Sequence, residues 1–151
     1  MQGVAEVVRR PIALVTAAVL LLEAPGVIVV NAVMARFVKA QSMSLDGMDP
    51  GAMYTGTWAL GVVSGIALAV CALVAFLAGV RDRRPGRAAR VLLIGCAVVH
   101  GVLAAVAVGL LGWAAFTFLV VVLGLVVLTL VAYGEGYDEA AEPLGEAPAA
   151  A

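Results

Sequence analysis

The sequence predicts an all-α protein, a four-helix transmembrane bundle with a disordered acidic C-terminal tail. The chain has 151 residues, of which 64% are hydrophobic and only 13% charged, whereas a soluble domain is roughly half apolar and about a quarter charged. The apolar residues also form long runs, and a helix needs about 20 such residues to cross a bilayer core of about 30 Å. Residues 1–133 are therefore expected to form one membrane domain with four spans.

Prolines and a cap mark the starts of the first two spans. The first covers about residues 11–37, and Pro11 suits a first helical turn because the missing N–H has no helical partner there. The second covers about residues 57–80. Asp49 followed by Pro50 is typical of an N-cap and first helical position, so this helix is expected to begin in the preceding loop.

The last two spans lie in one continuous apolar run of 43 residues, from Val91 to Tyr133. As a single helix it would be about 65 Å long, twice the thickness of the hydrocarbon core. The run must therefore fold back, and Gly109, Gly112 and Trp113 mark the turn. The third span is then about residues 91–110 and the fourth about 114–133.

Basic residues predict the orientation, because loops rich in Lys and Arg stay in the cytoplasm. With the N-terminus inside, two basic residues, Arg36 and Lys39, are outside. The seven inside are Arg9, Arg10, Arg81, Arg83, Arg84, Arg87 and Arg90. We therefore expect a multi-pass protein of the plasma membrane with both termini in the cytoplasm.

The tail, residues 134–151, contains five acids, no base and little apolar surface, so it is expected to be disordered. The inner loop "RDRRPGRAAR" contains five arginines. One interpretation is a topology signal that also meets anionic lipid headgroups. The other is that the acidic tail docks on this loop.

Small residues at four-residue spacing allow transmembrane helices to approach closely. Such positions predict facing seams of one bundle, and a homodimer interface is the alternative use of the same pattern. The expected seams are Gly61, Gly65 and Ala69 in the second span, and Ala97, Gly101, Ala105 and Gly109 in the third.

Two ionisable residues lie near the predicted midplane of the membrane. Counted from the cytoplasmic ends of their spans, Glu23 lies roughly 18 Å in and His100 roughly 14 Å in. Asn31 follows Glu23 by about two turns on nearly the same helix face. Pro25 removes a backbone donor, so the helix is expected to kink there, with Gly26 adding freedom.

Two interpretations of this midplane group stay open. A protonated Glu23 can donate a hydrogen bond to a neutral His100, and the pair then only fixes the order of the helices. Alternatively, Glu23, His100 and Asn31 form a proton relay or cation site, because ionisable groups inside a membrane often mark ion pathways.

Metal ligation has weak candidates only. Cys96 and His100 share a helix face, and Cys71 lies at a similar depth. Met43, Met48 and Met53 of the outer loop suit Cu(I) as soft ligands, but no His or Cys accompanies them. We therefore expect no metal site and no cofactor, with a metal-binding sensor kept as an alternative function.

Several function classes are disfavoured. No nucleophile motif, phosphate-binding glycine loop or catalytic dyad is present, so we expect no enzyme. The net charge of −1 disfavours nucleic acid as a partner. The expected function is a structural or accessory membrane protein whose partners are the lipid bilayer and a membrane protein or a second copy. The alternative is a small proton-coupled transporter that uses Glu23 and His100.

Two resemblances accompany these predictions. The runs "QSMSLDGMDPGAM", "RAARVLLIGCAVVHG" and "VVLGLVVLTLVAYGE" resemble small four-span integral membrane proteins of actinobacteria such as Streptomyces. This resemblance implies the fold class and the membrane location but no activity. The stretch "LLEAPG" is similar to the first span of small multidrug resistance transporters, which implies that Glu23 is a proton and cation site.

Overall fold

The computed structural model describes residues 2–41, 47 and 49–134, with side chains from Val8 onward. Met43, Met48 and the predicted disordered segment from residue 135 onward lie outside the described residues. The described part is helical, with no strand, and each helix is long and apolar enough to cross a membrane. The helices are α1 (Gln2–Ala40), α2 (Pro50–Arg81), α3 (Arg87–Leu110) and α4 (Trp113–Ala132).

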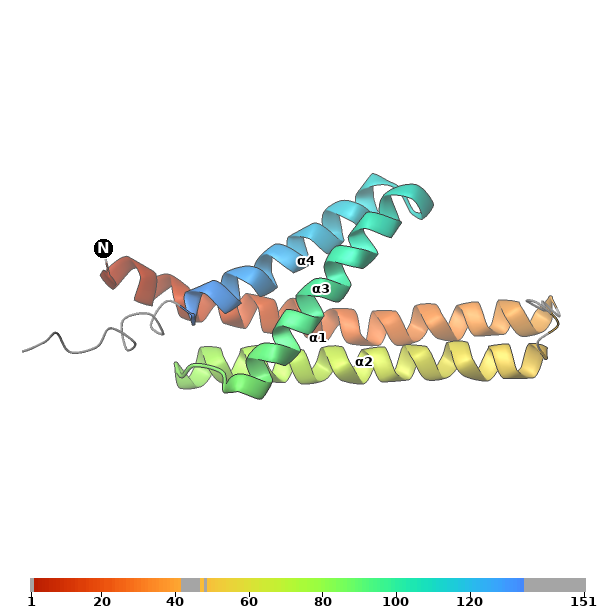
Figure 1. The fold of residues 1–151 in the computed structure, drawn as a ribbon, viewed down its shortest axis with the longest axis horizontal. Helices are drawn as coiled ribbons and strands as arrows, with labels where there is room; N and C mark the ends of the chain where they lie inside the picture. Colours follow the sequence, from red (N-terminus) through yellow and green to blue (C-terminus); the bar gives the residue numbers. More distant parts are fainter. Residues whose placement is uncertain (1, 42–46, 48, 135–151) are drawn as a thin grey trace, which may run out of the picture.

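The helices form two antiparallel hairpins that cross obliquely (Figure 1). The hairpins lie together near the N-terminus and diverge towards their tips. At a rise of 1.5 Å per residue, the 39 residues of α1 span about 58 Å and the 20 residues of α4 about 30 Å. The α1–α2 hairpin is therefore the longer of the two, and beyond the crossing it has no cover from α3 and α4.

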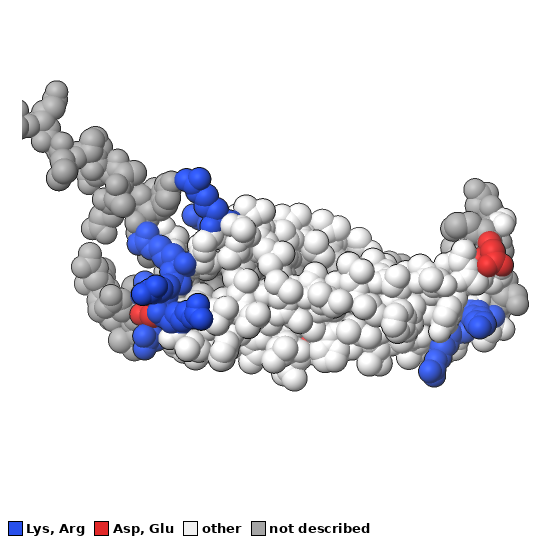
Figure 2. Space-filling model, turned by 90° about the horizontal axis from the view of Figure 1, so that it is seen from below, with Lys and Arg blue, Asp and Glu red and all other residues white. Residues whose placement is uncertain are grey.

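Charge separates to the ends of the molecule. Figure 2 shows the Lys and Arg side chains gathered at two ends, with an uncharged belt between them. We call the end with the N-terminus and the α2–α3 loop the inner end, and the opposite end the outer end. Large apolar side chains are exposed along the belt, including Leu22 at 77% and Leu110 at 78%. Such a belt matches the hydrocarbon core of a bilayer.

The first helix is longer than the predicted span of residues 11–37. It begins at Gln2 and contains Pro11 and Pro25, so Pro11 lies inside the helix and not in its first turn. A proline removes one helical hydrogen bond, but tertiary contacts of Arg9 hold the turn before Pro11. Pro25 and Gly26, expected at a kink, are exposed and do not interrupt the helix.

The other predicted boundaries agree closely with the structure. Asp49 is the N-cap of α2, where its Oδ2 accepts a hydrogen bond from Ala52 N at 3.0 Å, and Pro50 is the first helical residue. The turn between α3 and α4 falls at Leu111 and Gly112. Gly112 has φ +87°, a left-handed conformation that favours glycine.

The glycine seam of α2 packs against α1 and not against α3, which corrects the expected arrangement. A Cβ on Gly65 would stand 2.5 Å from Ile28 Cγ1 and 3.0 Å from the carbonyl oxygen of Ala24. A Cβ on Gly61 would collide with Asn31 Cβ. The close approach that small residues allow is therefore used within the first hairpin.

The expected seam of α3 does not face α2. A Cβ on Gly101 would meet only Leu123 of α4 at 3.9 Å, and one on Gly109 would meet nothing within 4 Å. Ala105 is exposed and Ala97 is half-buried. The buried face of α3 is instead formed by Leu93, Cys96, His100, Ala104 and Ala107. This face is rotated from the small-residue stripe around the axis of α3.

The core lies where the two hairpins cross. It joins all four helices and is made of Leu20, Cys71, Ala72, Leu93, Cys96, Val122 and Val126. The apolar sequence of α4 therefore contributes a buried edge, through Val122 and Val126, as well as its exposed surface. This core positions the polar groups described next.

Candidate functional site

A glutamate–histidine pair joins α1 to α3 inside the apolar belt. His100 Nε2 lies 3.1 Å from Glu23 Oε2 and 3.3 Å from Oε1. The side chains are 3% and 10% exposed for His100 and Glu23. The pair that the sequence placed at a common depth is therefore in direct contact.

The other imidazole nitrogen determines where the protons sit. His100 Nδ1 lies 2.8 Å from the carbonyl oxygen of Cys96, one turn earlier in α3. A carbonyl only accepts, so Nδ1 holds a hydrogen and donates it. Without a further proton, the Nε2 lone pair would face the carboxylate of Glu23. One proton shared between Nε2 and the carboxyl group removes that repulsion and leaves the pair neutral overall.

Asn31, the third member of the predicted group, lies apart from the pair. Its Nδ2 donates to the carbonyl oxygen of Val27 at 2.9 Å, within α1. Its Cβ packs at Gly61 in the seam between α1 and α2. Asn31 is therefore part of the first hairpin's packing and does not extend a relay from Glu23.

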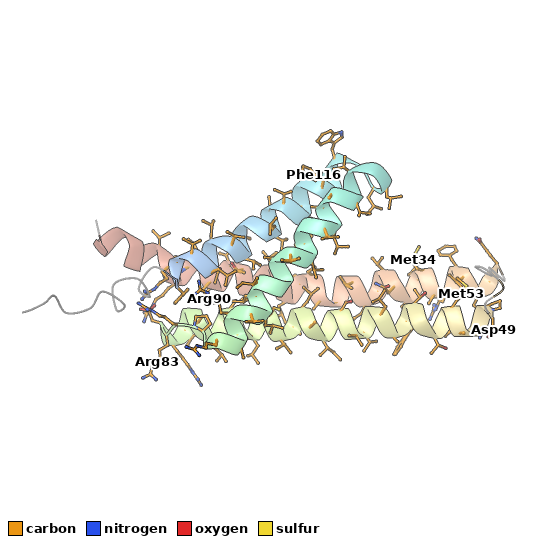
Figure 3. All side chains as sticks on the ribbon, viewed as in Figure 1. Met34, Asp49, Met53, Arg83, Arg90 and Phe116 are labelled. Atoms are coloured by element: carbon orange, nitrogen blue, oxygen red, sulfur yellow. The ribbon has the colours of Figure 1, made fainter. Side chains whose placement is uncertain are left out.

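The cysteines flank the histidine. Cys96 Sγ lies 3.6 Å from His100 Nδ1, and Cys71 Sγ donates weakly to the carbonyl oxygen of Leu92 at 4.0 Å. Within the described residues, no three His, Cys, Asp or Glu side chains are grouped so that they could hold a metal ion. Figure 3 places Met53 near Asp49 at the outer end of the molecule, in the first turns of α2.

Two surface grooves of the belt are lined by other residues than the pair. Neither Glu23 nor His100 lines them. A groove of about 500 Å³ lies on α1 and α2, between Leu14, Ala17, Ala18, Leu21, Ala69, Ala72, Leu73 and Phe76. A groove of about 360 Å³ lies further out on α2, between Tyr54, Thr55, Trp58, Ala59, Val62 and Val63. Both are lined almost entirely by apolar atoms.

A second polar contact joins the hairpins through threonines. Thr16 Oγ1 lies 2.9 Å from Thr129 Oγ1, and both residues are fully buried. Thr16 Oγ1 also lies 2.8 Å from the carbonyl oxygen of Ile12 in its own helix and 3.1 Å from that of Leu125. Thr129 Oγ1 lies 2.9 Å from the same carbonyl oxygen of Leu125. The spacing of Thr16 and Glu23, seven residues apart on one face of α1, was the available sequence signal for this contact.

We expect a double-mutant cycle of Thr16→Val and Thr129→Val to give a coupling energy of about 1 kcal/mol. Interhelical hydrogen bonds in membranes average about 0.6 and reach about 1.7 kcal/mol. The measurement is the free energy of unfolding in mixed detergent micelles. Thr117→Val is the control, because Thr117 is exposed and its hydroxyl donates to the carbonyl oxygen of Trp113 in its own helix. Additive effects of the two core substitutions would contradict the prediction.

A third polar cluster closes the inner end. Arg9 Nη2 donates to Asp82 Oδ1 at 2.8 Å, and Arg10 Nε lies 3.4 Å from Asp82 Oδ2. Tyr133 OH donates to the carbonyl oxygen of Ala78 at 3.0 Å, and the Arg9 guanidinium lies 5.0 Å from the centre of its ring. With spacing of seven, Arg9, Thr16 and Glu23 thus form a polar stripe on α1, and each contacts another element.

Tyr133 makes the stability of this cluster depend on pH. Burial raises the pKa of Tyr133 above its usual value, and the Asp82 carboxylate adds to this, while Arg9 and Arg10 oppose it. Because the unfolded chain then releases the phenol proton first, the stabilisation is complete below pH of about 10 and is lost as the pH rises further.

We therefore expect the free energy of unfolding of the wild type to fall as the pH rises above about 10. The fall should be smaller in Tyr133→Phe, which has no proton to lose. Tyr54→Phe, at the outer end, serves as the control and should keep the wild-type profile. The same slope in all three proteins would contradict the role of Tyr133.

The comparisons with known proteins found no relative of this chain. No protein-family model, no curated protein and no solved structure matches the chain.

Proposed function

We propose that this chain is a non-enzymatic integral membrane protein of the plasma membrane that acts through partners. In this proposal the intramembrane polar groups hold the two hairpins together, and the exposed helix faces meet lipid and a membrane-protein partner.

The observation that supports this proposal is the hydrogen bonding of the buried polar side chains. Within the described residues, no buried side-chain nitrogen or oxygen lacks a hydrogen-bond partner. His100 Nε2 and Glu23 Oε2 lie within hydrogen-bonding distance of each other, and neither residue lines the two grooves described above. A buried pair whose polar atoms are hydrogen-bonded to each other has the properties of a helix connector.

The expected orientation agrees with the charges at the two ends. The inner end contains seven arginines and the outer end Arg36 and Lys39 (Figure 2). Cytoplasmic loops are richer in basic residues, so we place both termini in the cytoplasm. A single cysteine introduced at the inner loop should then react with a membrane-impermeant thiol reagent only after the cells are opened.

Partner capture tests the proposal. We expect cross-linking in intact membranes, followed by purification, to yield a stoichiometric protein partner or a second copy. The yield should fall when the arginines of the inner loop are replaced or when residues 135–151 are removed. Recovery of uncross-linked monomer alone, from membranes in which the protein is folded, would contradict it.

A small proton-coupled transporter is the second candidate, favoured by the single proton shared between His100 Nε2 and Glu23. Glu23→Gln separates the two functions, because the glutamine amide can donate to Nε2 but cannot exchange a proton. A connector predicts a stable variant and no proton flux in liposomes from either protein. A transporter predicts a wild-type flux that the variant loses.

A further inference from the structure

The α2–α3 turn exposes a cluster of positive charge that the described residues do not neutralise. We call it the arginine face. Its members are exposed and form no ion pair within the described residues: Arg81, Arg83, Arg84, Arg87 and Arg90. Arg83 and Arg90 are labelled in Figure 3, at the inner end of the molecule.

The nearby acid is already engaged. Asp82, within the same turn, binds Arg9 at 2.8 Å and Arg10 at 3.4 Å. Its side chain is 28% exposed, so much of its carboxylate surface is taken up by these contacts. Asp82 therefore stabilises the N-terminal turns of α1 and leaves the five arginines without a counter-charge from the described residues.

The local helix geometry increases the positive potential there. Helix α3 begins at Arg87, its N-cap is Gly86 with no side-chain cap, and its first turn contains no acid. A helix N-terminus is the positive end of the helix dipole, and cations such as Arg87 and Arg90 are unfavourable beside it. An anion bound by these arginines would relieve the repulsion.

The position of the cluster indicates which anion is available. Helix α2 ends at Arg81 and α3 begins at Arg87, and both helices are apolar enough to cross a membrane. The arginine face therefore lies at the edge of the apolar belt, at the level of phospholipid headgroups. Guanidinium groups bind phosphate oxygens in a bidentate manner, which suits arginine more than lysine to this task.

We propose that the arginine face is a binding site for the phosphate headgroups of anionic phospholipids in the leaflet at the inner end. The inference requires only that the four helices lie in a bilayer. It does not depend on the role of the Glu23–His100 pair, so the liposome and partner experiments can fail without affecting it.

Lipid binding to the full chain in detergent micelles tests this proposal. Phosphatidylglycerol and phosphatidylcholine are compared as probes by native mass spectrometry. A basic residue near an anionic surface contributes about fivefold in affinity. Arg84→Gln/Arg87→Gln should therefore lower phosphatidylglycerol binding by about 25-fold and leave phosphatidylcholine binding unchanged. The control with the same change of charge is Arg36→Gln/Lys39→Gln at the outer end, which should bind phosphatidylglycerol as the wild type does.

Four results would overturn the proposal. The first is that the wild type binds both lipids with equal affinity. The second is that both double variants lose phosphatidylglycerol affinity equally, in which case net charge alone is responsible. The third is that inorganic phosphate at millimolar concentration displaces the lipid, which would indicate a soluble anion as the ligand. The fourth is that the full chain prefers phosphatidylglycerol only after the five acids of residues 135–151 are changed to amides. This result would indicate that the tail occupies the arginine face.

Discussion

Replacing His100 with leucine is expected to lower the free energy of unfolding by about 3 kcal/mol. The substitution removes the hydrogen bond to Glu23 at 3.1 Å and leaves that carboxyl group, 10% exposed, without its partner. Removing one member of a buried pair costs about 3–5 kcal/mol because the other remains unpaired. The measurement is reversible unfolding in mixed detergent micelles at pH 7.

Two further variants separate the contribution of the Glu23–His100 hydrogen bond to stability from that of the charge of Glu23. Glu23→Gln should stay within about 1 kcal/mol of the wild type, because its amide still donates to His100 Nε2. Glu23→Leu/His100→Leu should be more stable than His100→Leu alone, since no unpaired polar group is buried. If His100→Leu were as stable as the wild type, the pair would not hold α1 to α3.

Gly65→Val in the glycine seam should lower the free energy of unfolding by about 2–3 kcal/mol. The new Cβ would stand 2.5 Å from Ile28 Cγ1 and 3.0 Å from the carbonyl oxygen of Ala24. The carbonyl belongs to the backbone of α1, so the helices must move apart, and overpacking of this kind costs about 1–3 kcal/mol. Unfolding in mixed micelles measures the loss.

The matched control is Gly95→Val in α3. Gly95 also lies inside a helix, but a Cβ there would meet nothing within 4 Å. The same change of side chain should therefore alter stability by less than about 0.5 kcal/mol. Equal losses at Gly65 and Gly95 would mean that helix propensity, and not the close approach of α1 and α2, sets the cost.

Much of the site could be predicted from the depth of the side chains in the membrane and from their ionisable character. Glu23 and His100 are the ionisable residues at a common depth, and an ionisable group in a membrane needs a partner. Asn31 was wrongly grouped with them, since nearness on one helix face does not tell which neighbouring helix covers that face. At Asn31 the neighbour is Gly61 of α2, whereas at Glu23 it is His100 of α3.

The contacts that the sequence analysis missed lie on the same stripe. Arg9 and Thr16 precede Glu23 at intervals of seven and contact Asp82 and Thr129. The next position in this series, Val30, is 60% exposed. The polar stripe therefore ends at Glu23, where the hairpins part and no second hairpin remains to cover α1.

By itself the sequence determined the four apolar helices, the cap at Asp49 and the turn at Gly112, because these depend on hydropathy, length and local backbone geometry. Only the tertiary structure decided which helix each seam meets, since small residues permit close approach to any neighbour. The oblique crossing of the two hairpins determined the other contacts and the exposed faces. It brings Glu23 to His100, turns the stripe of Gly109 away from the core, and leaves the arginine face exposed at the inner end.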